Sequence, residues 1–282
     1  MPTTARTPCT SITSWNDGGA LIELIGKVAI VTGGASGIGA AACRAFAAEG
    51  SHIAVVDRDW EGCEAVATEV GGIAIRTDVG DQDSVNAMVA EVTAALGPID
   101  VCFSNAGIAT GGDILETEPE VWRDQWAINV MGHVYAVRAV LPGMLARGTG
   151  YLVHTASMAG ILTSHGNVTY ATTKHGVVGL TEWLSITYHH RGIGVSLLAP
   201  LGVSTPMLER ADPRFAAAVA GPIKDADYVA GLVVEAIREE RFLIVSDPIA
   251  ETWMHRKTDD PERWLQGMRR IQQQLEQGTL QQ

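Results

Sequence analysis

Residues 27–39, KVAIVTGGASGIG, decide the fold of this chain. The run KVAIVT at 27–32 is short, apolar and rich in β-branched residues, which is typical of a β-strand, and it passes directly into a cluster of glycines. The alanine-rich residues 40–50 that follow predict a helix. Because the apolar residues of the strand are consecutive rather than alternating, we expect both of its faces to be buried, as in a parallel sheet between two layers of helices.

The same alternation of strand and helix continues to about residue 247. Right-handed crossovers between parallel strands place helices on both faces of such a sheet. We therefore expect an α/β fold in which residues 26–247 form a single domain around one doubly wound, parallel, seven-stranded, Rossmann-like sheet. Further strands are predicted at 52–57, 73–77, 100–104, 151–155, 193–199 and 242–246, and helices at 60–70, 82–96, 119–147, 168–191 and 226–239.

The two ends of the chain depart from this pattern. Residues 1–25 form a polar leader rich in Thr and Ser, without the continuous apolar segment of a signal peptide. In residues 248–282, Asp260 and Pro261 mark the start of a helix, and the apolar residues after them recur on one face: Trp264, Met268, Ile271 and Leu275. This predicts a helical C-terminal tail that packs on the domain or on a sister subunit, with a lid over the substrate cleft as the alternative.

Length, composition and charge disfavour several classes of protein. The 282 residues are 46% hydrophobic and 18% charged, which fits one large folded domain rather than a disordered chain. The formal net charge of -12 disfavours nucleic-acid binding, and no stretch has the roughly 20 apolar residues of a membrane span. The four cysteines form no C-x-x-C pair and no zinc-site spacing, so we expect no metal site and a cytoplasmic protein with reduced thiols.

The glycine cluster after the first strand has the composition of a phosphate-binding loop. Gly33, Gly37 and Gly39 read T-G-x-x-x-G-x-G, which differs from the spacing G-x-G-x-x-G. Glycines at this point allow a tight turn and close approach of the backbone, and the N-terminus of the next helix attracts a pyrophosphate. Alone, the loop is also compatible with a purely structural turn.

Asp57 ends the second predicted strand, 18 residues after Gly39. A carboxylate at this place accepts hydrogen bonds from the adenosine ribose hydroxyls and repels a 2′-phosphate, so we expect NAD rather than NADP. Arg58 argues the other way, because a guanidinium can bind that phosphate, although it can also stack on the adenine or face solvent.

Three side chains form a candidate catalytic group. Tyr170 and Lys174 are four residues apart and therefore share one face of a predicted helix. A phenol titrates near 10 in water, so it needs a neighbouring cation such as Lys174 to act as a base near pH 7. Ser157 lies 13 residues before Tyr170, just after a predicted strand, where its hydroxyl can polarise a substrate oxygen. Asn129 by itself reads as an ordinary polar helix residue.

Taken in order, these motifs resemble the short-chain dehydrogenase/reductase family. The glycine loop is followed by Ser-Asn-Ala-Gly at 104–107, by Asn129, by Ser157, and by Tyr-Ala-Thr-Thr-Lys at 170–174, and the resemblance extends from about residue 26 to 245. It implies a dehydrogenase in which Tyr170 is the acid/base, assisted by Ser157, Lys174 and Asn129. The last of these would anchor a water that relays the proton. It also implies a homotetramer or homodimer built on the two long helices.

The resemblance further implies which residues bind the cofactor. Besides Tyr170 and Lys174, the expected set comprises the glycine loop, the end of the second strand, the adenine wall, the fourth strand end and the loop after 200: Gly33, Ser36, Gly37, Ile38, Gly39, Asp57, Arg58, Asp78, Val79, Asn105, Ala106, Gly107, Pro200, Val203 and Thr205.

The chain departs from the family pattern at three places. Ser104 stands where the family usually has Asn, a change that keeps the tight turn. Leu201 stands where Gly is usual, so a large side chain is expected on the nicotinamide or substrate side. About 35 residues follow residue 247, whereas many acyl-carrier reductases of the family end in a short strand with paired glycines, which disfavours an acyl-carrier role.

These observations predict an oxidoreductase that transfers a hydride between NAD and an uncharged, largely apolar secondary alcohol or ketone, a small-molecule substrate. No arginine or lysine stands out as a clamp for an acid. The alternatives are a reductase of carrier-bound 3-oxoacyl chains and a catalytically silent NAD-binding sensor. The expected substrate pocket is apolar, with Trp253 from the tail as a further candidate beside the main set: Ile108, Met158, Leu162, Leu201, Met207 and Leu208.

Overall fold

The computed structural model describes residues 23–210 and 221–279. Most of the expected polar leader therefore lies outside the described residues, and only its last residues, from Glu23 on, are inside them. Leu24 is buried, and its carbonyl oxygen accepts a hydrogen bond from the hydroxyl of Ser51 at 2.8 Å. The chain thus joins the domain body by about residue 24.

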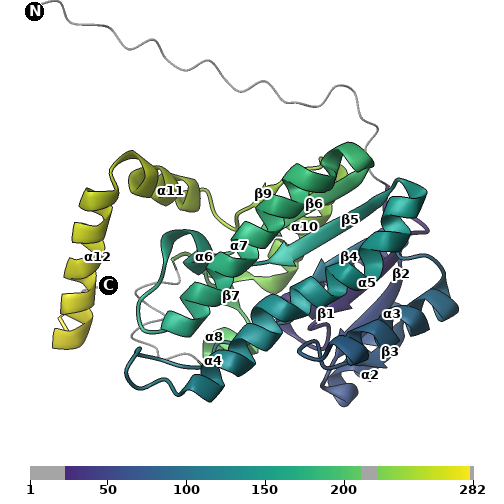
Figure 1. Ribbon diagram of the computed structural model, residues 1–282, viewed down its shortest axis with the longest axis horizontal. Helices are drawn as coiled ribbons and strands as arrows, with labels where there is room; N and C mark the ends of the chain where they lie inside the picture. Colours follow the sequence, from purple (N-terminus) through teal and green to yellow (C-terminus); the bar gives the residue numbers. More distant parts are fainter. Residues whose placement is uncertain (1–22, 211–220, 280–282) are drawn as a thin grey trace, which may run out of the picture.

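The centre of the molecule is one parallel sheet of seven strands (Figure 1). Its strand order is β3-β2-β1-β4-β5-β6-β9, so the chain moves outward from β1 in one direction and then in the other. This confirms the predicted doubly wound sheet. The strands are β1 Val28–Thr32, β2 His52–Asp57, β3 Ile73–Arg76, β4 Val101–Ser104, β5 Gly150–Thr155, β6 Ile193–Leu198 and β9 Leu243–Ile244.

Helices cover both faces of the sheet. The helices α1, α2 and α10 contribute to one core, and α3, α5 and α7 contribute to the other. The predicted boundaries of α2 and α3 agree with the structure. The helices are α1 Gly37–Ala48, α2 Trp60–Val70, α3 Gln82–Leu96, α5 Gly132–Arg147, α7 Val168–Tyr188 and α10 Ala226–Arg238.

The consecutive apolar residues of each strand divide between these two cores. All five residues of β1 are buried. Ala29 and Val31 pack in the cluster that contains Phe46 of α1. Val28 and Ile30 pack in the opposite cluster, with residues of α3 and α5. Because neighbouring side chains of a strand point to opposite faces, a strand buried on both sides must be apolar at every position.

The helix predicted at 119–147 is divided in three in the structure. Helix α4, Pro119–Trp126, passes through the π-helical turn η1, Ala127–Met131, into α5. Gly132 follows that turn, and a Cβ at this position would lie 3.1 Å from the carbonyl oxygen of Val79. A sequence pattern with a period of 3.6 residues does not reveal one wider turn, and such turns are frequent at functional sites.

The C-terminal tail consists of two helices, α11 Ile249–Asp259 and α12 Pro261–Gln277. The predicted start of α12 is confirmed, because Asp260 accepts a hydrogen bond from the backbone N–H of Arg263 at 3.0 Å, and the helix ends at Gly278, which adopts the left-handed conformation. Both helices lie within the predicted helical tail at 248–282, although the sequence did not indicate where α11 begins. The sequence did not predict four shorter elements: α6 Ala159–Leu162, α8 Pro206–Glu209, and the paired strands β7 Val203–Ser204 and β8 Lys224–Asp225. Figure 1 shows α11 and α12 at the end of the molecule opposite α2 and β3.

In residues 23–210 and 221–279, no helix is both long and apolar enough to cross a membrane.

Candidate active site

A cavity of about 1400 Å³ opens beyond the carboxyl ends of the strands. Its wall includes the turn after β1, the residues after β2, β4, β5 and β6, and parts of α7, α11 and α12. Doubly wound sheets bind their ligands at this edge, where the strand order reverses. The cavity brings together most of the residues that the sequence singled out.

The loop needs glycine at three positions, either for a left-handed backbone or for close approach of another backbone segment. Gly33 has the left-handed φ of 67°, and a Cβ there would lie 2.9 Å from the Cα of Ala106. Gly37 is also left-handed, with φ 52°. Gly39 approaches the loop so closely that a Cβ would lie 2.0 Å from the carbonyl oxygen of Gly33. Gly39 does not line the cavity, and its lack of a side chain allows the close packing of the loop.

The N-terminus of α1 is suited to an anion. The side chain of the N-cap residue Ser36 accepts no hydrogen bond from the backbone N–H groups of the first turn, and that turn contains no acidic residue. Ser36 and Gly37 line the cavity together with Ile38. Backbone N–H groups and the helix dipole at such a terminus attract a phosphate group. The loop therefore fits the pyrophosphate of a dinucleotide.

Asp57 lies on the cavity wall beside Arg58. One carboxylate oxygen of Asp57 accepts a hydrogen bond from the N–H of Ala35 in the glycine loop, and the other accepts one from the N–H of Asp59, both at 3.1 Å. A carboxylate oxygen can accept about two hydrogen bonds. Each oxygen therefore retains capacity for a further donor, as a ribose diol requires.

The turn after β4 is fixed by Thr32 at the end of β1. The hydroxyl of Thr32 accepts hydrogen bonds from the N–H groups of Asn105 at 2.9 Å and Ala106 at 3.1 Å, and its carbonyl oxygen accepts one from the Asn105 carboxamide. The Asn105 oxygen in turn accepts from the hydroxyl of Thr155. Ser104 is buried and keeps the turn, as expected. The remaining expected wall residues Asp78, Val79 and Gly107 also line the cavity.

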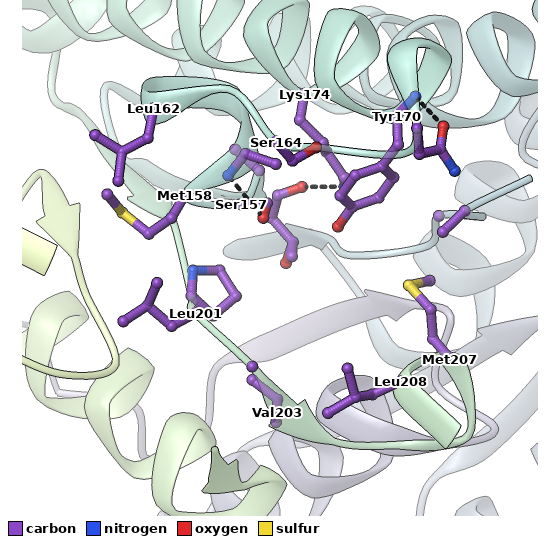
Figure 2. Close-up of a pocket in the computed structure, with 18 of the residues that line it drawn as sticks. Ser157, Met158, Leu162, Ser164, Tyr170, Lys174, Leu201, Val203, Met207 and Leu208 are labelled. Carbon is purple, nitrogen blue, oxygen red and sulfur yellow. Dashed lines mark hydrogen bonds between the residues drawn. The ribbon is translucent and has the colours of Figure 1, made fainter. Parts of the chain in front are cut away.

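Tyr170 and Lys174 project from the first turns of α7 toward Ser157 (Figure 2). Asn167 caps α7 by accepting a hydrogen bond from the N–H of Tyr170 at 2.9 Å. The ammonium of Lys174 lies 5.6 Å from the centre of the Tyr170 ring and donates to the carbonyl oxygen of Thr155 at 2.8 Å. Lys174 is thus held by the end of β5 and by its own helix.

The two titratable side chains respond to burial in opposite directions. Burial lowers the pKa of Lys174 to about 8, so the side chain is still mainly protonated at pH 7. Burial also raises the pKa of Tyr170, and the Ser157 side chain acts against that increase. A cation beside a buried phenol favours the phenolate, so the arrangement partly offsets the cost of burial.

Ser157 follows β5, and its side chain lies beside that of Tyr170 (Figure 2). Its hydroxyl oxygen accepts a hydrogen bond from the N–H of Ala159 at 3.1 Å. Because an N–H group cannot accept, the hydroxyl hydrogen of Ser157 is directed elsewhere, and the residue lines the cavity with Tyr170 and Lys174. The hydroxyl is therefore available to donate to an oxygen in the cavity.

Asn129 is buried in the π-helical turn and does not line the cavity. Its carboxamide accepts from the N–H of Ile108 at 2.8 Å and donates to the carbonyl oxygen of Ile108 at 2.9 Å and to the hydroxyl of Thr173 at 3.1 Å. A Cβ at Gly107 would lie 3.3 Å from the Asn129 oxygen and 3.4 Å from the Lys174 nitrogen. The Asn129 side chain thus holds the cavity wall in place.

All six residues of the expected substrate pocket line the cavity, and so does Trp253. Leu201 is buried and packs with Met158 and Leu162 and against α11. Met207 is 40% exposed, so it lies at an open part of the wall. The expected cofactor residues Pro200, Val203 and Thr205 line the same cavity beside the expected substrate pocket: Ile108, Met158, Leu162, Leu201, Met207 and Leu208.

Two parts of the wall lie beyond the substrate pocket predicted from the sequence. One is the segment 163–167 between α6 and α7, which the sequence did not indicate. The other is the apolar stripe of the tail, Trp264, Met268 and Ile271, for which a lid over the substrate cleft was the alternative prediction. The tail also brings three arginines to the cavity, although no arginine stood out in the sequence: Arg256, Arg263 and Arg270. Arg263 and Arg270 are seven residues apart on α12 and therefore share one of its faces, which was the available signal, whereas Arg256 lies on α11.

The described part of the chain brings no three His, Cys, Asp or Glu side chains together in a way that could hold a metal ion. Cys43, Cys63 and Cys102 are buried free thiols, and Cys9 lies outside the described residues. Burial raises the pKa of Cys43 to about 12 and that of Cys102 to about 11, so neither thiol is reactive at neutral pH.

The model of the family called short chain dehydrogenase matches residues 27–214. The 2,5-dichloro-2,5-cyclohexadiene-1,4-diol dehydrogenase of Sphingobium indicum is 41% identical over 193 residues, which are 67% of this chain and 77% of that protein. The D-threitol dehydrogenase of Mycolicibacterium smegmatis is 38% identical over 194 residues, 67% of this chain and 75% of that protein.

Solved structures agree with this match. A short-chain dehydrogenase/reductase of Burkholderia phymatum in complex with NAD superposes with a TM-score of 0.79 and 31% identity over 86% of this chain and 96% of that one. A 3-ketoacyl-(acyl-carrier-protein) reductase of Brucella melitensis complexed with NADH gives a TM-score of 0.74 with 27% identity, over 79% and 97% of the two chains.

Proposed function

Because the chain belongs to the short-chain dehydrogenase/reductase family, we propose that its cavity holds NAD beside an uncharged, largely apolar secondary alcohol or the corresponding ketone. The chain is an oxidoreductase that acts on the CH–OH group of a small-molecule secondary alcohol and uses a nicotinamide cofactor. One observation carries the proposal: Ser157, Tyr170 and Lys174 converge on the cavity that the glycine loop also lines.

The residues around the cavity fit a dinucleotide along its whole length. The glycine loop at 33–39 binds the pyrophosphate, Asp57 and Arg58 face the adenosine, and Asp78 and Val79 face the adenine. Lys174 would hold the nicotinamide ribose, and residues 105–107 and the loop 200–205, which also line the cavity, would border it. The carboxylate of Asp57 favours NAD over NADP, because it binds ribose hydroxyls and repels a 2′-phosphate.

The protein residues supply the proton chemistry. When it is bound, the nicotinamide accepts a hydride from the alcohol carbon or returns it to the ketone. Ser157 donates its hydroxyl hydrogen to the substrate oxygen and orients it. Tyr170 removes the hydroxyl proton as the phenolate, which the charge of Lys174 favours, and returns it in the reverse direction. Asn129 holds the wall at Ile108 and anchors a water that relays the proton outward.

A survey of cofactors and alcohols tests this function. Formation of reduced cofactor is measured with NAD and with NADP across cyclic, aromatic and aliphatic secondary alcohols, some of which carry a carboxylate. Turnover of neutral alcohols with NAD is the expected result. A marked preference for the acids, which Arg256, Arg263 and Arg270 could bind, would contradict the uncharged substrate. Binding of NAD without turnover of any alcohol would favour the sensing role.

A reductase of carrier-bound 3-oxoacyl chains is the second candidate, because the Brucella melitensis structure is of such an enzyme. The position of the tail disfavours it. The apolar residues of α12 line the cavity and narrow the space that a carrier-linked chain would need. This candidate would be favoured if the protein reduced a carrier-linked 3-oxoacyl substrate faster than any free ketone.

The domain division is part of the proposal. Residues 26–247 form the dehydrogenase domain and residues 248–282 form a tail that covers the substrate end of the cavity. Trp264, Met268 and Ile271 support the tail's role as a cover, because they line the cavity. Truncation after Asp247 should raise KM for the alcohol more than KM for NAD. An equal change in both would indicate that the tail only stabilises the fold.

A homotetramer or homodimer built on the long helices is the proposed assembly. Trp126, Trp183 and Ile186 are large apolar side chains with 41%, 55% and 81% exposure on α4 and α7, and association of two copies would cover such a surface. Val130 and Val137, which belong to the same predicted helix as Trp126, are buried within the chain. Light scattering should give a dimer or tetramer, and a monomer would refute the assembly.

The cytoplasm is the proposed location. It rests on the buried free thiols Cys43, Cys63 and Cys102, since thiols persist in a reducing compartment. Fractionation of the producing cell tests it, and recovery of the protein outside the cytoplasm would refute it.

A further inference from the structure

The segment 163–167 crosses the cavity wall between α6 and α7, in other words between Ser157 and Tyr170. Thr163 has a φ of 76° and Gly166 a φ of 74°, both in the left-handed region. Left-handed backbone is uncommon for a β-branched residue such as Thr, and such residues cluster where the surrounding structure fixes a functional geometry. The segment presents two consecutive polar side chains, Ser164 and His165, to the cavity.

Both side chains carry a buried polar atom without a partner. The hydroxyl oxygen of Ser164 and Nε2 of His165 are shielded from solvent, and neither has a hydrogen-bond partner among the described residues. Leaving a buried polar group unpaired is costly, so most such groups in folded proteins are hydrogen-bonded. Figure 2 shows Ser164 among the residues that surround Ser157 and Tyr170. Two unpaired atoms on the wall of the substrate pocket indicate a ligand group.

A chain of hydrogen bonds from α12 determines which ring nitrogen of His165 donates and which accepts. The carboxamide nitrogen of Gln272 donates to Glu276 at 2.9 Å, which orients the amide. The carboxamide oxygen of Gln272 then lies 2.8 Å from Nδ1 of His165. Because an amide oxygen only accepts, Nδ1 carries the hydrogen and Nε2 of the neutral ring is an acceptor.

Ser164 complements that acceptor. Its hydroxyl can donate as well as accept, whereas Nε2 of His165 can only accept. One group satisfies both residues: a hydroxyl, which donates to His165 and accepts from Ser164. An ether or a carbonyl oxygen has no hydrogen to donate, and an apolar substituent satisfies neither residue.

We propose that Ser164 and His165 form a second polar subsite, which binds a hydroxyl group of the substrate other than the one oxidised at Ser157 and Tyr170. The substrate class is accordingly a diol or polyol whose remaining surface is apolar and lies against Met158, Leu162 and the stripe of α12. Gln272 is a positioning residue that acts through His165. This inference rests on the proposed alcohol dehydrogenase function.

The test compares matched alcohols. The kcat/KM with NAD is measured for the cyclohexane-1,2-, 1,3- and 1,4-diols, their monomethyl ethers and cyclohexanol. For the wild-type protein, kcat/KM for the best diol should exceed kcat/KM for its monomethyl ether by about tenfold or more, because the ether leaves the acceptor of His165 unpaired. In Ser164→Ala and His165→Leu this ratio should fall to about one to three.

Variants in α12 separate recognition from folding. Gln272→Leu should lower the diol-to-ether ratio severalfold, because His165 loses its orienting partner. Gln273→Leu is the matched control on the exposed side of the same helix and should leave the ratio unchanged. Melting temperatures identify any variant that fails to fold, and the α12 pair does not alter the strained segment.

The outcomes separate the two proposals. If the wild-type protein oxidises cyclohexanol and the ethers as well as every diol, the subsite is wrong while the dehydrogenase function stands. If the ratio is high but folded Ser164→Ala and His165→Leu proteins retain it, another group recognises the second hydroxyl and the subsite is again wrong. If no alcohol is oxidised with either cofactor, the proposed function fails, and the subsite fails with it.

Discussion

Replacement of Asp57 by Ser should change the cofactor preference of the protein. Each oxygen of the Asp57 carboxylate already accepts one backbone N–H at 3.1 Å and has capacity for one ribose hydroxyl. A hydrogen bond to a charged group contributes about 1.5–3 kcal/mol. Loss of one such bond therefore raises KM for NAD about 10- to 100-fold at about 1.4 kcal/mol per tenfold.

NADP should gain from the same change. A neutral serine hydroxyl in place of the carboxylate would no longer repel the 2′-phosphate, and Arg58 lies beside this position on the cavity wall. The ratio of kcat/KM for NAD to that for NADP should thus fall by about 100-fold or more, which combines the lost ribose bond with the lost repulsion.

The assay measures initial rates with each cofactor at a fixed alcohol concentration for the wild-type protein, Asp57→Ser and Asp59→Ser. Asp59 is two residues away, caps α2 by accepting from the N–H of Gly62 at 3.3 Å, and can be replaced by Ser as a cap. The control should leave the ratio unchanged. The assignment of Asp57 would be refuted if the wild-type protein used NADP as efficiently as NAD. It would also be refuted if Asp57→Ser and Asp59→Ser changed the ratio of kcat/KM for NAD to that for NADP by the same factor.

Three further predictions concern catalysis, the loop and stability. Tyr170→Phe should lower kcat at least 100-fold while leaving the Kd for NAD within about threefold, because it removes the proton acceptor and leaves the glycine loop unchanged. Initial rates measure kcat and fluorescence titration measures the Kd for NAD. Retained turnover would contradict the role of Tyr170. Gly39→Ala should weaken NAD binding at least tenfold and lower Tm, because its Cβ would lie 2.0 Å from the carbonyl oxygen of Gly33. The control is Gly231→Ala in α10, which should stabilise the protein slightly because the space at its Cβ position is open. Burial lowers the pKa of His154 to about 4 and also lowers that of His133, 3.0 Å away. The unfolded chain therefore binds more protons than the folded protein between pH 6.5 and 4. The contribution of His154 alone, about 3 kcal/mol at about 1.4 kcal/mol per pKa unit, is present above pH 6.5 and is lost as the pH falls toward 4, and that of His133 changes in the same direction. Urea unfolding should show a shallower loss between pH 7 and 5 for the double variant His133→Leu, His154→Leu than for the wild type, and an unchanged slope for the exposed His52→Gln.

The features that could be predicted from the sequence are those that short-range chemistry determines. The spacing of Gly33, Gly37 and Gly39 reflects backbone conformations and close approaches within one turn. Tyr170 and Lys174 share a face because they are one helical turn apart. The strand runs are apolar at every position because each strand contributes to two cores. Such patterns are complete within a few residues, so no coordinates are needed to interpret them.

Features that depend on contacts between distant segments could not be predicted in this way. The π-helical turn at 127–131 coincides with the hydrogen bonds that Asn129 makes to Ile108, 21 residues away. Helix α11 lies within the predicted helical tail, but it packs on α6, which the sequence did not indicate. The unpaired atoms of Ser164 and His165 become visible only when every neighbour is known.

Gln272 shows how a sequence pattern can hide a functional contact. It lies four residues after Met268 and therefore continues the apolar face of α12, yet it stands first in the run Gln272-Gln273-Gln274, which reads as a solvated surface. In the fold, Gln272 contacts His165, 107 positions earlier in the chain. The apolar stripe that covers the cavity and the polar group that orients the second subsite thus belong to one helical face. Any change that displaces α12 should reduce apolar contact with the substrate and recognition of its hydroxyl together, whereas a change at Gln272 alone should affect only the latter.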